Sequence, residues 1–285
     1  MTASGTFGYG IEFADFLDLS KLGGVIVKGL SLLPSAGNPP PRIVETASGM
    51  LNAIGLENIG IEAFITEKLP YLKSYHVPVF VNIYGKTIEE YARITERINR
   101  EDDIAGIEVN ISCPNVKAGG AAFGANPDTA AIVVETVKKI TQKPVMVKLS
   151  PNVTDIVAIA LRVEAAGADS ISLINTLIGM AIDIETRKPK LANITGGLSG
   201  PAIKPIALRM VFEVARRVHI PVIGIGGIMT PQDAIEFLIA GASAIQIGTA
   251  NFINPQATLQ ILNGIVDYMQ QKQIGHISEL IGCLT

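Results

Sequence analysis

The sequence holds only two cysteines, Cys113 and Cys283, and they lie far apart. Two thiols cannot build the disulfide framework of a small secreted protein. They are also too few for a structural zinc or an iron–sulfur cluster, each of which usually needs about four ligands. Three histidines are present, and none is near Cys113: His76 and His219 precede predicted strands, and His276 lies near the C-terminus. A Cys–His hydrolase is therefore poorly supported, and we predict no metal site.

Charge and long apolar runs are also scarce. Only 17% of the 285 residues are charged, the net charge is −3 and the pI is near 5.7. This balance gives no support to a nucleic-acid partner, which would need a clustered basic surface. There is no apolar run of about eighteen residues, which a membrane span would need, and no secretory signal. We predict a soluble, cytoplasmic enzyme or binding protein that has no contact with membranes.

What the sequence does contain is a repeat of short apolar runs and longer stretches of helical periodicity. The runs cover residues 24–28, 79–83, 106–112, 144–150, 170–176, 221–227 and 244–250. The helical stretches cover residues 87–100, 127–141, 154–166, 204–218, 231–240 and 255–272. Alternation of this kind predicts a parallel sheet, either a closed barrel or an open doubly wound sheet.

Local signals set the expected ends of these elements. Gly167 and Gly241 follow predicted helices, as C-terminal glycines do. Three helices have Pro in the first turn after a residue able to cap it, namely Asn126-Pro127, Thr230-Pro231 and Asn254-Pro255. A closed barrel needs eight strands, and residues 1–3 resemble the end of one more. We therefore predict an α/β fold, a (β/α)8 TIM barrel with its first strand truncated at the N-terminus, in a single domain over residues 1–285.

Two long connections interrupt the repeat, at residues 29–76 and 177–203. The first holds a run of three prolines, Pro39 to Pro41, which cannot be helical. We predict both as ordered functional loops, because long loops at one end of a barrel build substrate pockets.

The predicted strands end in amides, ammonium groups and glycines, which should meet at the C-terminal mouth of a barrel. We interpret them as a site, not as solvated strand ends. Glycines after the last two strands let backbone N–H groups approach a phosphate, belonging either to a substrate or to a flavin mononucleotide. The strand ends are Lys28, Asn82, Asn110, Lys148, Asn175-Thr176, Gly226-Gly227 and Gly248-Thr249.

Three residue types at this mouth could carry chemistry. Cys113 follows a strand and precedes a Gly-rich segment, where it could act as nucleophile, base or metal ligand; a thiol pKa of about 8.5 makes a base feasible. Lys148 could stabilise charge on a reduced flavin or serve as a Schiff-base lysine. Four asparagines could pair with a pyrimidine ring or simply occupy turns: Asn52, Asn110, Asn115 and Asn175.

Motifs along nearly the whole chain resemble dihydroorotate dehydrogenase of class 1B, in its catalytic, FMN-containing subunit. The most specific are SGMLNAIGLEN, EVNISCPN, VKLSP, LINT, GGLSGPAIKP, IGGI and IGTAN. The resemblance implies that dihydroorotate gives a hydride to FMN and becomes orotate, in pyrimidine biosynthesis. It also implies a homodimer and a partner subunit that carries FAD and an iron–sulfur cluster and passes electrons to NAD.

The same resemblance assigns roles to individual residues. Cys113 is the expected base. The expected FMN-binding residues are Ser4, Lys28, Gly29, Asn82, Asn110, Lys148, Ile174, Gly200, Gly226, Gly227, Gly248 and Thr249. The expected substrate-binding residues are Lys28, Asn52, Ala53, Ile54, Gly55, Leu56, Asn110, Asn115, Asn175 and Thr176. The alternatives are a dihydropyrimidine dehydrogenase-like flavoenzyme, a phosphate-binding barrel lyase that uses Lys148, and a non-catalytic ligand-binding barrel.

Overall fold

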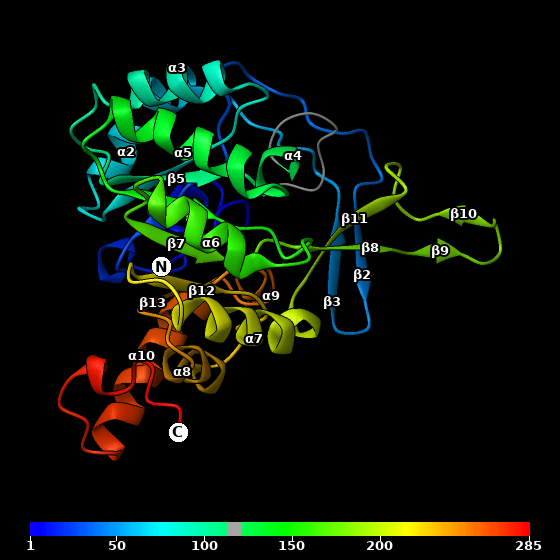
Figure 1. Ribbon diagram of the computed structural model, residues 1–285. Coiled ribbons are helices and arrows are strands. Elements are labelled where there is room, and N and C mark those ends of the chain that lie inside the picture. Colours follow the sequence, from blue (N-terminus) through cyan, green and yellow to red (C-terminus); the bar gives the residue numbers. More distant parts are fainter. Residues whose placement is uncertain (113–120) are drawn as a thin grey trace.

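The seven predicted strands all form, and they pair side by side in one parallel sheet (Figure 1). The computed structural model describes residues 1–112 and 121–285. For residues 121 and 122 it describes the backbone alone. Within these ranges the strands follow one another around the sheet in chain order. They are β1 (Val25–Ile26), β4 (Val79–Ile83), β5 (Gly106–Asn110), β6 (Val145–Lys148), β7 (Ser170–Leu173), β12 (Val222–Ile225) and β13 (Ala244–Gln246).

Residues 1–3 occupy the gap between the first and last of these strands. Thr2 forms a parallel bridge with Ile247, just after β13, and its N–H donates to the carbonyl of Gly24, just before β1. The N–H of Ala3 donates to the Ile247 carbonyl at 2.8 Å. The chain start thus contacts both edges of the sheet, as the predicted short strand of a closed barrel would.

Helices follow the strands and lie outside the sheet (Figure 1). The predicted caps at Asn126 and Thr230 form: the Asn126 side chain accepts from the N–H of Asp128, and Thr230 makes a capping box with Asp233. The prediction that Asn254 is an N-cap is wrong: α9 ends at Ile253 with Asn254 as its C-cap, and the last helix begins at Ala257 with Gln256 as its N-cap. The main helices are α3 (Ile88–Ile98), α5 (Pro127–Ile140), α6 (Ile156–Ala165), α7 (Lys204–Ala215), α8 (Pro231–Ile239), α9 (Ala250–Ile253) and α10 (Ala257–Gln271), with a short α4 (Ala121–Gly124).

The two faces of the barrel strands differ in chemistry. Residues such as Val81, Val109 and Val147 point outward and pack with the helices in the main core. Because side chains alternate along a strand, the residues between them point into the barrel. Near the strand starts these are apolar and form a separate small cluster of Ile26, Met146 and Ile223 with Met1, Phe80 and Ala244. Further along the strands they become polar: Asn82, Glu108, Lys148, Ser172 and Gln246 are all buried.

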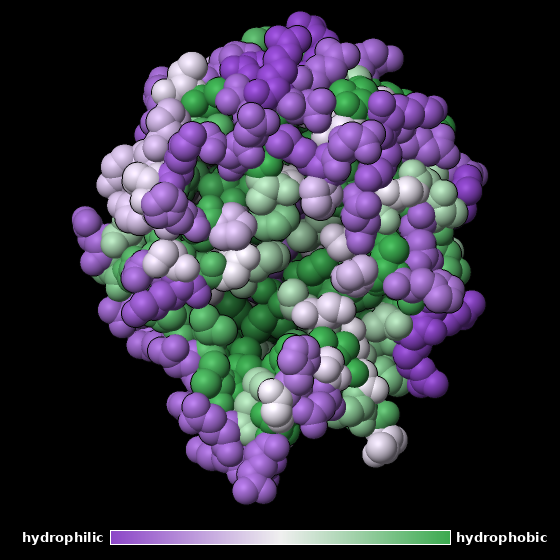
Figure 2. Space-filling model, turned by 90° about the vertical axis from the view of Figure 1, so that its left-hand side faces the viewer, coloured by the Kyte–Doolittle hydropathy of each residue, from purple (hydrophilic) through white to green (hydrophobic). Residues whose placement is uncertain are grey.

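The barrel strands begin on the left-hand side of Figure 1. Figure 2 shows this face, where hydrophobic residues lie near the centre and hydrophilic residues surround them. His76 and His219 are both exposed and precede β4 and β12, as predicted, so they lie at the strand starts. This arrangement is typical of the end of a barrel that supports stability, opposite the end that carries chemistry.

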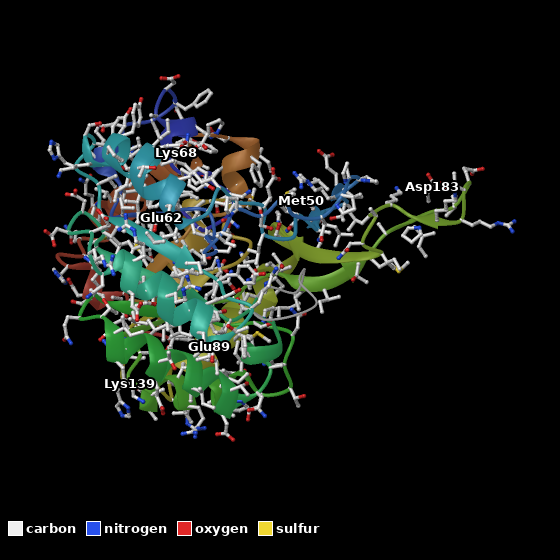
Figure 3. The ribbon with its side chains drawn as sticks, turned by 90° about the horizontal axis from the view of Figure 1, so that it is seen from above. Met50, Glu62, Lys68, Glu89, Lys139 and Asp183 are labelled. Atoms are coloured by element: carbon white, nitrogen blue, oxygen red, sulfur yellow. The ribbon has the colours of Figure 1, made fainter. Side chains whose placement is uncertain are left out.

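The two long connections, predicted as loops, form strands and helical turns. Strands from both pair into one antiparallel sheet in the order β2 (Ile43–Thr46), β3 (Gly49–Asn52), β11 (Thr195–Ser199) and β8 (Leu177–Met180). Beyond β8 a hairpin of β9 (Ile182–Asp183) and β10 (Lys188–Pro189) projects from the molecule, with Asp183 near its tip (Figures 1 and 3). The first connection also forms α1 (Ile61–Ala63), a π-helical turn (Phe64–Lys68) and α2 (Leu69–Lys73).

Among the residues that the structure describes, no helix has the length and apolar character to cross a membrane.

Candidate active site

A cavity of about 430 Å³ opens at the carboxyl ends of the barrel strands, beside β3 and β11 of the antiparallel sheet. A smaller cavity of about 80 Å³ adjoins it under the loops after β12 and β13. The two share lining residues from four parts of the chain, so they form one continuous site: Ser4, Thr6, Lys148, Asn175, Thr176 and Ser199. The combined size is in the range of small-molecule and cofactor sites.

One half of the site, which we call the glycine half, is lined by the smaller cavity's Gly200, Gly226, Gly227, Gly248 and Thr249. Gly226 and Gly227 have φ values of 129° and 72°, a region that favours glycine. A Cβ on Gly227 would lie 2.7 Å from the backbone nitrogen of Lys204, so the chain here passes close to the start of α7. Backbone N–H groups of such turns are suited to a phosphate.

The other half, which we call the amide half, is lined by side chains on the ends of β3, β5 and β7. Those at the ends of β5 and β7 are joined in a chain of hydrogen bonds: Asn175 Nδ2 donates to Ser112 Oγ at 2.8 Å, and Ser112 Oγ donates to Asn110 Oδ1 at 3.0 Å. Asn52 Nδ2 donates to the Gly197 carbonyl at 3.3 Å, which ties β3 to β11 at the edge of the cavity. Because their partners fix them, these amides present donors and acceptors in set directions.

Two lysines of the described part of the chain, Lys28 and Lys148, line the larger cavity. Burial lowers the pKa of Lys28 below its ordinary value, and the charge of Glu57 partly opposes this shift. An ammonium group held where water is partly excluded favours an anionic ligand. Lys148 lies deeper: its Nζ donates to Ser4 Oγ at 3.1 Å and is 3.9 Å from Glu108 Oε2.

Beneath the site lies a buried carboxylate, Glu108, which is not among the predicted site residues. Glu108 is fully buried inside the barrel and accepts hydrogen bonds from Asn82, Ser172 and Gln246. A charged residue two positions before Asn110 in an otherwise apolar strand was the available signal, because residues i and i+2 face the same side. Its partners come from other strands, and only the fold brings them together.

The structure brings nearly all the predicted site residues to this one cavity. Each of the twelve residues predicted to bind FMN lines it. Of the predicted substrate-binding residues, Ala53 does not line the cavity and is fully buried, and Asn115 lies outside the described residues. The predicted base, Cys113, also lies outside the described residues. The cavity also has lining residues that were not predicted, among them Thr6, Gly8, Glu12, Phe13, Ile43, Met50, Ser199 and Phe252.

The barrel and its divided mouth are typical of phosphate-binding (β/α)8-barrel enzymes. Residues 1–269 match the family model described as dihydroorotate dehydrogenase. The chain belongs to the dihydroorotate dehydrogenase family.

Individual relatives agree with this assignment. The chain is 61% identical over 284 residues to a protein of Geotalea daltonii and 62% identical to one of Citrifermentans bemidjiense, both named dihydroorotate dehydrogenase B (NAD(+)), catalytic subunit. Each match covers 100% of this chain and 93% of the relative. A crystal structure of the Eimeria tenella dihydroorotate dehydrogenase in complex with ferulenol has a TM-score of 0.77 at 23% identity, over 93% of this chain and 79% of that one. At this identity the structural match speaks for the fold alone.

The family implies a flavin cofactor, and the cavity has the features to hold one. In the glycine half the backbone itself lines the cavity, and a side chain added at Gly226 or Gly227 would meet neighbouring atoms at 2.7 Å. At the bottom of the same half, Gln246 is fully buried, and its Oε1 has no hydrogen-bond partner among the described residues. A buried acceptor without a partner is costly, so a ligand donor at this position would satisfy it.

Proposed function

We propose that this chain is the catalytic subunit of a dihydroorotate dehydrogenase that oxidises dihydroorotate to orotate in pyrimidine biosynthesis. We further propose that residues 1–285 form a single FMN-binding barrel domain and that NAD is the final electron acceptor. Full-length similarity to relatives that carry this name supports the proposal. The observation that carries it is the joining of a glycine cradle and an amide-rich, lysine-containing pocket in one cavity.

In this proposal the two halves of the site have separate tasks. The glycine half holds the FMN phosphate through Gly226, Gly227, Gly248 and Thr249, and Lys148 stabilises charge on the reduced ring. FMN, when bound, supplies the chemistry of accepting the hydride. Lys28 pairs with the substrate carboxylate. The amides of Asn52, Asn110 and Asn175, together with the hydroxyl of Thr176, orient the pyrimidine ring, whose C=O and N–H groups alternate.

Cys113 is the proposed base that takes a proton from the substrate as the hydride leaves. This role comes from the motif EVNISCPN, since the residue lies outside the described part of the chain. Cys113→Ala should slow flavin reduction by dihydroorotate by at least about 100-fold, the lower end for a general base. Orotate should still bind with nearly unchanged affinity. Anaerobic stopped-flow absorbance measures the reduction, and an unchanged rate would remove Cys113 from this role.

We also propose a homodimer with a partner subunit that carries FAD and an iron–sulfur cluster, in the cytoplasm. The projecting hairpin supports contact with a second copy of the chain, because Ile178, Met180, Ile182 and Ile184 on β8, β9 and the turn are exposed. Clustered apolar side chains of this kind mark interaction surfaces. Light scattering should give the mass of a dimer, and Ile182→Asp should shift it toward the monomer; a wild-type monomer would contradict this part.

The alternatives are separated by substrate. A dihydropyrimidine dehydrogenase would act on a substrate without a carboxylate and would have no use for Lys28 in the pocket. Comparing dihydroorotate with dihydrouracil tests this directly. For a lyase, Lys148 would have to act as a nucleophile, yet its ammonium is hydrogen-bonded to Ser4 and close to Glu108. Borohydride trapping of a carbonyl substrate on Lys148 would support the lyase hypothesis.

A further inference from the structure

The buried Glu108 joins five strands of the barrel through side chains. Its Oε2 accepts from Asn82 Nδ2 on β4 at 2.6 Å and lies 3.9 Å from Lys148 Nζ on β6. Its Oε1 accepts from Ser172 Oγ on β7 at 2.9 Å and from Gln246 Nε2 on β13 at 3.0 Å. Buried carboxylates are expensive unless they are paired and hydrogen-bonded, and this one is both.

Three of these partners line the cavity: Asn82, Lys148 and Gln246. A carboxylate can only accept, so each partner must turn its donor atom down toward Glu108. The opposite atom of each amide is thereby fixed. Asn82 Oδ1 accepts from Asn110 Nδ2 at 3.4 Å, and Gln246 Oε1 is the buried acceptor without a partner among the described residues.

We propose that Glu108 is a positioning residue for the flavin: it aims Asn82 and Gln246 at the cofactor and offsets the charge of Lys148 beneath it. This inference rests on the proposed flavin site and goes beyond it, because Glu108 itself lines neither part of the cavity. Gln246 Oε1 then accepts from a donor of the flavin, either a ring N–H or a hydroxyl of the ribityl chain.

The charge of Glu108 gives the proposal a signature that a packing role would lack. Reduction adds negative charge to the flavin ring, and a fixed anion nearby opposes it. Glu108→Gln keeps the shape of the side chain, removes the negative charge and leaves Lys148 uncompensated. The midpoint potential of the bound flavin should therefore shift to a more positive value. The amide introduced by Glu108→Gln accepts hydrogen bonds at only one atom, whereas the carboxylate accepts at two. Asn82 or Gln246 must therefore turn, and the flavin should bind more weakly.

The experiment uses purified holoenzyme and two readouts other than turnover: the flavin midpoint potential, from spectroelectrochemical titration, and the flavin dissociation constant, from fluorescence. Ser172→Ala is the matched control, because it removes one hydrogen bond from Glu108, keeps the charge and changes a residue that lines neither part of the cavity. We expect a positive shift in Glu108→Gln and none in Ser172→Ala. Equal potentials in wild type and Glu108→Gln would overturn the proposal.

A second variant decides the matter if Glu108→Gln does not fold. Gln246→Met keeps the volume and removes both the C=O and the NH2 of the side-chain amide, so it should weaken flavin binding about tenfold, the effect of one hydrogen bond, with little change in potential. Unchanged flavin affinity in Gln246→Met would also contradict the proposal. A wild-type protein that binds no flavin at all would instead refute the proposed function, so the two failures are distinguishable.

Discussion

The glycine half and the amide half of the site bind by different means. In the glycine half the backbone lines the cavity, and Gly226 and Gly227 are needed because their φ values and close contacts leave no room for a side chain. In the amide half, side chains such as Asn110 and Asn175 line the cavity, and both are hydrogen-bonded to Ser112. A backbone site tolerates almost no substitution, whereas a side-chain site should lose its contacts one at a time.

The largest expected effect is in the glycine half. Gly227→Ala places a Cβ 2.7 Å from the Lys204 backbone at a φ of 72°. The strain should lower the free energy of unfolding by about 1–3 kcal/mol and displace the loop that holds the flavin phosphate. We expect the purified variant to be nearly colourless, as measured by the ratio of flavin to protein absorbance.

The matched control for this variant is Gly275→Ala. Gly275 is exposed, and a Cβ there would come no closer than 3.6 Å to Glu279 Oε1. Its flavin content and thermal midpoint should equal those of the wild type. If Gly227→Ala also kept a full complement of flavin, the glycine half would not be the phosphate site.

A smaller and more selective effect is expected from Lys28→Met in the amide half. It removes the cation proposed for the substrate carboxylate and keeps most of the aliphatic stem. Orotate should bind about 10- to 100-fold more weakly, since hydrogen bonds to charged groups contribute about 1.5–3 kcal/mol. Flavin content should fall much less than orotate affinity, because the other eleven predicted FMN-binding residues are unchanged. Lys21→Met, on an exposed lysine of the turn Leu19–Lys21, controls for the loss of charge. Equal losses of affinity in the two variants would show that the effect is not local.

The smallest effect is on the pH dependence of binding. Burial lowers the pKa of Lys28, so in the free enzyme this group loses its proton below the ordinary lysine range near 10.5. Between the lowered value and 10.5 the unfolded chain binds more protons than the folded one, and stability therefore rises with pH in that window. Orotate affinity should change in the opposite direction, because binding uses the cation. Titration calorimetry across alkaline pH should show this fall in wild type and its absence in Lys28→Met.

Much of the barrel could be predicted from periodicity alone. The residues 79–83 were predicted as a strand and form β4 with the same bounds, and residues 127–141 were predicted as a helix and form α5 one residue shorter. Strand ends carrying Asn or Lys led to the cavity because parallel strands all end on one side. The predicted start of the last helix at Pro255 is two residues too early, because Asn254, a residue type suited to an N-cap, is instead the C-cap of the preceding helix α9.

Other features depend on partners that are distant in sequence. β3 pairs with β11 across about 145 residues, as the bond from Asn52 to Gly197 shows, so neither strand has a local signal for its partner. The same holds for Glu108, whose partners Asn82, Ser172 and Gln246 come from three other strands. The sequence itself determined the barrel, its glycine turns and its family motifs, because these rest on local periodicity and backbone freedom. Only the tertiary structure decided which polar side chains meet inside the barrel, because inward-facing register is set when the strands close around a common axis.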